Sequence, residues 1–326
     1  MTHLPPTERR NPRTGDIDTL ESADVLRLLL EEDARAVEAA RAATGQLARA
    51  VDETHLRLAR GGRVHYFGAG ASGRLAVLDA TEITPTFGAP SELFTAHFAG
   101  GPKALTDSSI DREDAGALGA ADAGGAGAAD VAVGITASGS TAYVVGALRG
   151  ARAAGALTVL VTCNPDAPAR DLADIVVVAD TGPEALTGST RLKAGTATKV
   201  ILNAFSTAVM IKAGRTYGNL MVGLVATNAK LAERAVGLLV EASGADAQTC
   251  GAALEQASGN IPEALVRLLT GCSGEQARAA LREHPGVRAA VAALDGQAAL
   301  NGQAATLNGQ AATLDGPGAT LDGQAG

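Results

Sequence analysis

The sequence is poor in aromatic residues. Of its 326 residues only 2% are aromatic and none is tryptophan, although 46% are hydrophobic. Alanine, valine and leucine must therefore fill the core. A core of such small side chains suits helices packed closely on a sheet better than a β-sandwich. The chain is long enough for one large domain and a smaller one.

Cysteine is also scarce. Cys163, Cys250 and Cys272 lie far apart and form no Cys-X-X-Cys motif. An odd and sparse set is typical of a reducing compartment, and we expect each thiol to be a small core residue rather than a nucleophile. The five histidines show no metal-ligand spacing with cysteines or acids. We therefore predict no metal and no cofactor.

Basic residues are outnumbered, and long apolar runs are missing. The 27 lysines and arginines stand against 35 acids, a formal net charge of -8. This balance argues against nucleic acid as a partner, because phosphate backbones require clustered cations. Residues 1–18 are polar and lack the apolar core of a secretory signal, and no stretch reaches the length of a membrane span. We expect a soluble, cytoplasmic protein that binds no membrane.

Strand-like and helix-like segments alternate through the middle of the chain. Helical periodicity over 23–59 predicts two leading helices, and further helices are expected from about Arg74 and over 142–153. Short apolar, β-branched runs predict buried parallel strands at residues 63–68, 130–136, 157–162 and 174–179. The alternation predicts an α/β fold, a doubly wound and mostly parallel sheet flanked by helices.

Four regions follow from the composition. Residues 1–22 form an N-terminal arm, and residues 23–225 contain the α/β domain with its leading helices. Residues 226–293 have a purely helical pattern, which predicts a small all-helical C-terminal subdomain. Residues 294–326 repeat Leu-Asp/Asn-Gly, and a glycine in every unit opposes a coiled coil. We predict that this last segment is a low-complexity, disordered tail.

Two glycine loops lie where a predicted strand gives way to a helix. They are Gly68–Gly73 and Ala137–Thr141. At such junctions small residues let the backbone approach a ligand, and the helix N-terminus offers unpaired N–H groups to an anion. Neither loop is a Walker A motif, and the GxGxxG match of the first is weak alone. Each by itself fits an ordinary turn, but two at successive strand ends favour a phosphosugar site.

Both loops resemble the phosphate and sugar loops of the sugar isomerase (SIS) domain. Four further stretches resemble the N-acetylmuramic acid 6-phosphate etherase family: Thr7–Pro12, Leu78–Gly88, Leu186–Thr196 and Tyr217–Val222. The resemblance runs from about residue 7 to about 290, in family order. Three positions depart from it. Ser140 stands where the family often has arginine, Ala142 where it often has proline, and Ala71 where threonine or serine is usual.

The resemblance implies an enzyme, a carbon–oxygen lyase. It would cleave the D-lactyl ether of N-acetylmuramic acid 6-phosphate to give N-acetylglucosamine 6-phosphate and D-lactate, in the recycling of cell-wall amino sugars. By resemblance Glu82 is the acid that protonates the departing lactate. Glu113 is the base at C2 and in the addition of water. Taken without the family, Glu82 reads as a helix-surface carboxylate and Glu113 as part of an acidic loop. A homodimer with the active site near the subunit interface is also implied.

Other polar residues are candidates for holding the sugar phosphate. We predict this role for Ser72, Gly73, Ser138, Gly139, Ser140, Thr141, Ser189, Thr190 and Lys193. A helix cap or an ion pair explains Lys193 and Arg191 equally well. His65 lies inside a predicted strand and is expected to be a packed core residue. Asp79 either orients a neighbouring group or caps a turn.

Two other functions stay open. Glucokinase regulatory protein resembles this family and senses sugar phosphates without catalysis, so a sugar-phosphate-sensing module is one alternative. An aldose–ketose phosphosugar isomerase is the other, because it shares the loops and the deprotonation at C2. The retained pair Glu82 and Glu113 favours catalysis over sensing.

Overall fold

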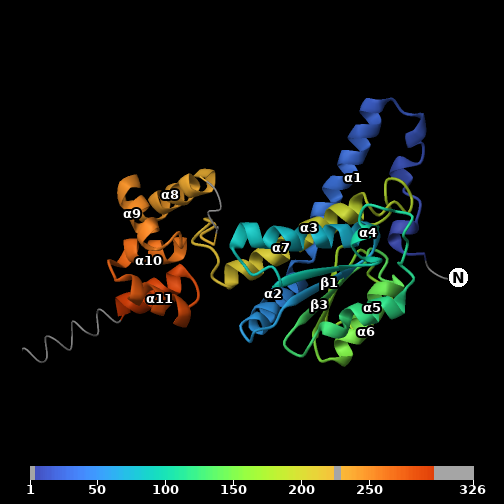
Figure 1. Cartoon of the computed structure of the whole chain (residues 1–326). Coiled ribbons are helices and arrows are strands. Elements are labelled where there is room, and N and C mark those ends of the chain that lie inside the picture. Colours follow the sequence, from blue (N-terminus) through green and yellow to red (C-terminus); the bar gives the residue numbers. More distant parts are fainter. Residues whose placement is uncertain (1–3, 224–228, 297–326) are drawn as a thin grey trace, which may run out of the picture. The chain divides into compact units, whose positions relative to one another are not determined.

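The computed structural model describes residues 4–223 and 229–296. The chain divides into two compact units, Met1–Arg215 and Thr216–Gly326 (Figure 1). The division falls ahead of the boundary expected at residues 225 and 226. The predicted low-complexity tail lies, apart from its first three residues, outside the described residues.

The first unit is built on one parallel sheet of five strands in the order β2-β1-β3-β4-β5. The strands are β1 (Val64–Gly68), β2 (Phe94–Phe98), β3 (Val131–Ile135), β4 (Leu157–Thr162) and β5 (Ile175–Val178). The predicted α/β fold is therefore confirmed. The sequence predicted β1, β3, β4 and β5 but missed β2. This strand lies at the edge of the sheet and is half-buried in its middle, so it lacks the continuous apolar run of the inner strands.

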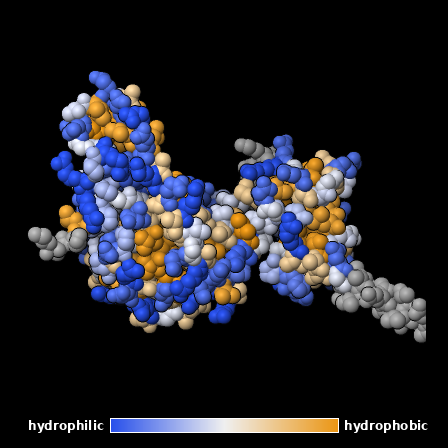
Figure 2. All heavy atoms as spheres, turned by 180° about the vertical axis from the view of Figure 1, so that it is seen from behind, coloured by the Kyte–Doolittle hydropathy of each residue, from blue (hydrophilic) through white to orange (hydrophobic). Residues whose placement is uncertain are grey.

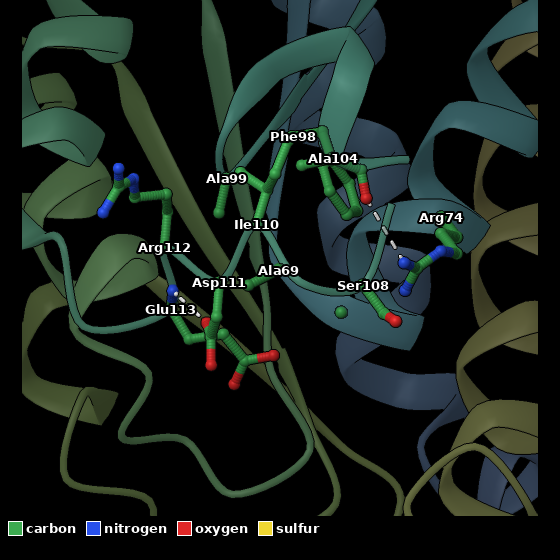
Figure 3. Close-up of a pocket in the computed structure, with 11 residues that line it drawn as sticks. Ala69, Arg74, Phe98, Ala99, Ala104, Ser108, Ile110, Asp111, Arg112 and Glu113 are labelled. Carbon is green, nitrogen blue, oxygen red and sulfur yellow. Dashed lines mark hydrogen bonds between the residues drawn. The ribbon is translucent and has the colours of Figure 1, made fainter. Parts of the chain in front are cut away.

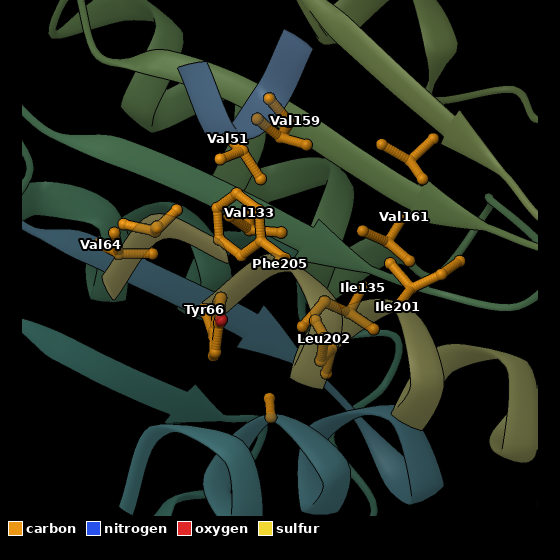
Figure 4. Close-up of a cluster of buried hydrophobic side chains, with 14 of the residues drawn as sticks. Val51, Val64, Tyr66, Val133, Ile135, Val159, Val161, Ile201, Leu202 and Phe205 are labelled. Atoms are coloured by element: carbon orange, nitrogen blue, oxygen red, sulfur yellow. The ribbon is translucent and has the colours of Figure 1, made fainter. Parts of the chain in front are cut away.

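Helices cover both faces of the sheet. They are α1 (Ser22–Ala42), α2 (Thr44–Leu58), α3 (Gly70–Phe87), α4 (Gly101–Ala104), α5 (Gly116–Asp122), α6 (Ala142–Ala153) and α7 (Lys193–Lys212). Alternate residues of each strand point to opposite faces. Tyr66 and Val133 pack with Phe205 of α7, in the cluster shared with α1, α2 and α3 (Figure 4). On the other face Phe67 packs in the cluster that contains Leu148 of α6.

Among the described residues, α7 is the helix whose length and composition would allow it to cross a membrane. Half of its apolar window is buried inside the protein. Ile201, Phe205 and Val209 of α7 belong to the core cluster on the sheet. The apolar character of α7 is therefore explained by its place in the core.

The N-terminal arm is held by the carboxylate of Glu32, a residue of α1 that is 4% exposed. Arg13 donates to one carboxylate oxygen over 2.5 Å, and Lys193 at the start of α7 donates to the other over 2.5 Å. Asn11 adds a hydrogen bond of 2.9 Å. One buried anion thus joins the arm, α1 and α7. The arm itself contains short 3-10 turns at Pro6–Glu8, Pro12–Thr14 and Ile17–Thr19.

The second unit is helical in its described part. It contains α8 (Ala229–Ser243), α9 (Ala247–Gln256), α10 (Ile261–Thr270) and α11 (Gly274–Glu283). Asp246, Asn260 and Ser273 cap the N-termini of α9, α10 and α11 with side-chain hydrogen bonds. Cys250 and Leu265 lie in the core of this unit. Hydrophobic side chains also reach the surface of both units on the face drawn in Figure 2.

Candidate active site

The carboxyl ends of β1 and β3 lie side by side, because the two strands pair in register with Gly68 opposite Ile135. The chain leaves β1 for β2 on one side and then returns to β3 on the other, so the strand order reverses between them. Open α/β sheets bind their ligands at such switch points. Both predicted glycine loops lie here, one after each strand.

The first loop is shorter than expected, because α3 begins at Gly70 rather than near Arg74. Gly70 has a φ of +53°, a conformation that favours glycine. A Cβ atom on Gly73 would lie 2.6 Å from the carbonyl oxygen of Gly68, so only glycine permits this close packing of strand and helix. Ser72 is half-buried in the first turn of α3, where backbone N–H groups are free to meet an anion.

The second loop is held in shape by its own hydroxyl groups. Thr136 and Thr141 share a hydrogen bond of 2.8 Å between their Oγ1 atoms, and Ser138 and Ser140 share one of 2.9 Å. The N–H of Gly139 donates to Thr136 Oγ1 over 3.2 Å. The loop is thus preformed ahead of α6. Ser140, which stands where the family often has arginine, is exposed.

Glu113 lies between the two loops. Its backbone carbonyl accepts a hydrogen bond of 2.9 Å from the N–H of Tyr143, in the first turn of α6. Its carboxylate Oε1 lies 2.6 Å from the point where a Cβ on Gly70 would stand. Asp111 fixes the turn by accepting the N–H of Glu113 over 3.0 Å (Figure 3). The carboxylate therefore occupies the space that the absent side chain of Gly70 leaves.

A pocket of about 180 Å³ opens beside this carboxylate (Figure 3). It is lined by Ala69, Gly70, Arg74, Phe98, Ala99, Ala104, Ser108, Ile110, Asp111, Arg112 and Glu113. Glu113 is an exposed residue at its rim, but the protein atoms around its carboxylate partly desolvate it. That burial raises the pKa of Glu113, the charges of Asp111 and Asp114 raise it further, and Arg74 opposes them.

Arg74 is a site residue that the sequence did not single out. Its guanidinium carbon stands 5.4 Å from the ring centre of Phe98, and its Nε donates to the carbonyl of Leu105 over 2.8 Å. Arg74 thus presents a fixed positive charge on the pocket wall. Phe98 is the last residue of β2, the strand that the sequence analysis missed. Had β2 been predicted, its carboxyl end would have indicated this side of the pocket.

Glu82 does not share the pocket of Glu113 within one chain. It is exposed on α3, twelve residues beyond Gly70. At the rise of an α-helix this spacing is about 18 Å along the axis, well beyond hydrogen-bonding reach. Asp79 has a structural place instead. It is 3% exposed and accepts hydrogen bonds from Tyr66, Asn203 and Ser206.

The remaining predicted residues lie apart from the pocket lining. Ser189 and Thr190 are half-buried in the segment before α7. Lys193 is 1% exposed, and its ammonium binds Glu32. Substrate contact by these three residues stays a prediction. His65 is buried, as expected, and its Nδ1 lies 3.1 Å from Nε2 of His97.

Metal-ligating side chains are dispersed in this structure. Within residues 4–223 and 229–296, no three His, Cys, Asp or Glu side chains are grouped so as to hold a metal ion. The pocket lining does carry the carboxylate of Glu113 and the guanidinium of Arg74.

Two family models match the chain. One is the SIS domain, over residues 113–208, and the other is the glucokinase regulatory protein N-terminal SIS domain, over residues 46–152. Among solved structures, a phosphoheptose isomerase from Francisella tularensis is 18% identical, with a TM-score of 0.48 over 59% of this chain and 100% of that one. This likeness is too distant to indicate the family of the chain.

Curated relatives are much closer. An N-acetylmuramic acid 6-phosphate etherase from Thermobifida fusca is 52% identical over 265 residues, which cover 81% of this chain and 87% of the relative. One from Salmonella choleraesuis is 46% identical over 288 residues, covering 87% and 97%. Identity at this level over nearly the whole relative, together with the two loops and Glu113 at the switch point, shows that the chain belongs to the N-acetylmuramic acid 6-phosphate etherase family.

Proposed function

We propose that this protein cleaves N-acetylmuramic acid 6-phosphate to N-acetylglucosamine 6-phosphate and D-lactate. The observation that carries the proposal is the place of Glu113. It contacts Gly70 in the first glycine loop and Tyr143 just after the second, at the switch point of a chain 52% identical to an etherase. The homodimer and the cytoplasmic location expected from the sequence belong to the same proposal.

The reaction needs one base and one acid. In the open-chain sugar, the proton on C2 is acidic because it lies next to the C1 aldehyde. Removal of this proton sends its electron pair into a C2=C3 double bond, the bond from C3 to the lactyl oxygen breaks, and that oxygen takes a proton from the acid. Water then adds its oxygen to C3 and a proton to C2. The two carboxyl groups end in their starting protonation states.

Glu113 suits the role of the base. Partial desolvation and the neighbouring Asp111 and Asp114 raise its pKa, which strengthens the carboxylate as a proton acceptor. Its position at the pocket rim leaves the carboxylate open to a substrate. Glu82 is proposed as the acid that protonates lactate.

The phosphate and sugar are proposed to bind at the two loops. The first turn of α3 offers backbone N–H groups there, and Ser72, Ser138, Ser140 and Thr141 add hydroxyl donors. Gly73 and Gly139 permit close approach of the backbone. Ser189, Thr190 and Lys193 are proposed as further sugar-phosphate contacts, although the ammonium of Lys193 is bound to Glu32.

The test is release of D-lactate from N-acetylmuramic acid 6-phosphate by the purified protein. We expect turnover by the wild type. Glu113→Gln should lower kcat by a factor on the order of 1,000 while sugar-phosphate binding is retained, because removal of a general base costs mainly rate. Asp114→Asn, a neighbouring change of equal size, is the matched control and should keep kcat within about tenfold.

Other outcomes would favour other functions. Binding of the sugar phosphate without turnover by the wild type would favour a sensor, a function to which the match with the glucokinase regulatory protein domain gives some support. Conversion of fructose 6-phosphate or glucosamine 6-phosphate without lactate release would favour an isomerase.

A further inference from the structure

The pocket beside Glu113 contains a positive charge that neither the base nor the glycine loops require. Arg74 of α3 lines this pocket together with Ser108. Arg112 belongs to the lining as well, but Figure 3 shows its side chain pointing away from Glu113 and Arg74. Arg74 is therefore the cation placed to meet a ligand in this pocket, which indicates an anionic group on that ligand.

The guanidinium of Arg74 is fixed in position. Its Nε donates to the carbonyl of Leu105 over 2.8 Å, and its Nη2 donates to the carbonyl of Ala104 over 3.3 Å. The guanidinium carbon lies 5.4 Å from the ring centre of Phe98. Neither hydrogen bond involves Nη1, so the N–H groups of that nitrogen can meet another acceptor. A cation that is held in this way loses little freedom when it binds an anion, which favours affinity.

The substrate of the proposed function carries two anionic groups. One is the phosphate, which is assigned to the glycine loops. The other is the carboxylate of the lactyl group, which an ether oxygen joins to C3. Because C3 is bonded to C2, the carbon from which Glu113 would take a proton, the lactyl group must lie beside the carboxylate of Glu113, where the pocket opens. The second loop, Ala137–Thr141, does not belong to the pocket lining, so the two anions have separate places to bind.

The pocket fits a lactyl group in size and in chemistry. Its volume of about 180 Å³ equals about six water molecules at roughly 30 Å³ each, which is enough for the methine, methyl and carboxylate groups. Phe98, Ala99 and Ile110 give the lining an apolar part that suits the methyl group. Arg74 and Ser108 supply N–H and O–H donors for the carboxylate, and a planar guanidinium matches the geometry of a carboxylate.

We propose that Arg74 binds the carboxylate of the lactyl group and so determines the preference of this protein for the ether-bearing sugar phosphate. The proposal rests on the function proposed above. It assigns a residue to the part of the substrate that distinguishes N-acetylmuramic acid 6-phosphate from N-acetylglucosamine 6-phosphate. The lactyl carboxylate is charged both in the bound substrate and in the transition state, so Arg74 stabilises the two about equally. Loss of Arg74 should therefore raise KM more than it lowers kcat.

A pair of substrates tests the proposal. They are N-acetylmuramic acid 6-phosphate and its analogue in which the lactyl carboxylate is a primary amide, and cleavage of each is followed by release of the lactyl product. We expect the wild type to prefer the acid by about 10- to 100-fold in kcat/KM, the usual effect of a hydrogen bond to a charged group. Arg74→Gln should lower kcat/KM for the acid by a similar factor, mainly through KM, and should lose the preference. Lys103→Gln is the matched control, because Lys103 is an exposed cation of the neighbouring helix α4 and does not line the pocket.

Inhibition by N-acetylglucosamine 6-phosphate separates this role from a structural one. This product keeps the phosphate and the sugar but lacks the lactyl group. We expect its inhibition constant to be the same within about twofold for the wild type, Arg74→Gln and Lys103→Gln, because the lost contact is not one that this product makes. If Arg74→Gln weakens the binding of both sugar phosphates by the same factor, Arg74 holds the phosphate or the loop, and the proposal is overturned.

The wild type alone already provides a decisive measurement, which does not depend on the folding of any variant. Equal kcat/KM for the acid and the amide would overturn the role of Arg74 and leave the proposed function standing. A wild type that releases no D-lactate from N-acetylmuramic acid 6-phosphate would instead refute the proposed function, and the role of Arg74 would be refuted with it. The two failures are therefore distinguished by lactate release from the acid.

Discussion

Replacement of Glu32 by glutamine should destabilise the first unit by about 3 kcal/mol at neutral pH. Burial by itself would raise the pKa of Glu32, but the hydrogen bonds from Arg13 and Lys193 outweigh it and lower the pKa from the usual 4.5 to about 2. At about 1.4 kcal/mol for each pKa unit, this shift corresponds to about 3 kcal/mol of stability. Loss of one partner from a buried ion pair costs a similar amount, about 3–5 kcal/mol.

The sign of the pH dependence follows from the lowered pKa. The unfolded chain takes up a proton at Glu32 as the pH falls through 4.5, whereas the folded chain does so only near 2. The stabilisation is therefore complete above the unfolded pKa and is lost as the pH falls toward the folded one. The difference between wild type and Glu32→Gln should shrink from about 3 kcal/mol at pH 7 to about 2 kcal/mol at pH 3.5.

Urea unfolding at both pH values, followed by circular dichroism, measures the difference. Hydrogen exchange of the α1 and α7 amides assigns it to this part of the chain. Glu31→Gln is the matched control, because Glu31 is the preceding residue of α1 and pairs with Arg27 in solvent, where each side chain is 56% exposed. The control should cost less than about 1 kcal/mol. A Glu32→Gln penalty as small as the control, or one that does not change with pH, would refute the reasoning.

Two further predictions concern the sheet and the second loop. Burial lowers the pKa values of His65 and His97, and the unfolded chain therefore binds more protons below about pH 6.5. The melting temperature should fall as the pH drops from 6.5 to 5, and less steeply in His97→Phe; equal slopes would contradict this. Gly139→Ala should cost about 3 kcal/mol and weaken sugar-phosphate binding, because Gly139 has a φ of +75° and a Cβ there would lie 2.2 Å from the Cβ of Ala167. Gly124→Ala, where a Cβ meets nothing within 4 Å, is the control, and equal unfolding free energies for the two variants would count against the prediction.

Much of the fold was readable from local patterns. The inner strands could be predicted because a parallel strand that is covered on both faces has a continuous apolar sequence, as in Leu157–Thr162. The edge strand Phe94–Phe98 has a neighbouring strand on one side only, and its middle residues are half-buried. These residues are threonine, alanine and histidine, so the strand lacks the continuous apolar run by which the inner strands were predicted. The early start of α3 was missed because Gly70 begins the helix with a positive φ. The spacing of apolar residues in the sequence gives no information on such a backbone angle.

The site was readable in part. The glycine loops were found because glycine is the residue that favours the positive φ angles seen at Gly70 and Gly139. The contact of Glu113 with Gly70 was not, since it joins residues far apart in sequence through the sheet. The separation of Glu82 from Glu113 was missed for a different reason. Resemblance transfers the roles of residues, but it carries no information on whether two residues of one chain meet.

The Glu32 cluster also bears on how the protein is made. Asn11, Arg13 and Lys193 all bind Glu32, but Lys193 follows all five strands of the sheet in the sequence and is synthesised long after Asn11 and Arg13. Chains fold progressively from the N-terminus during synthesis. The complete cluster therefore forms only after the sheet has been synthesised and α7 has emerged, so Glu32 meets its lysine partner later than it meets Asn11 and Arg13.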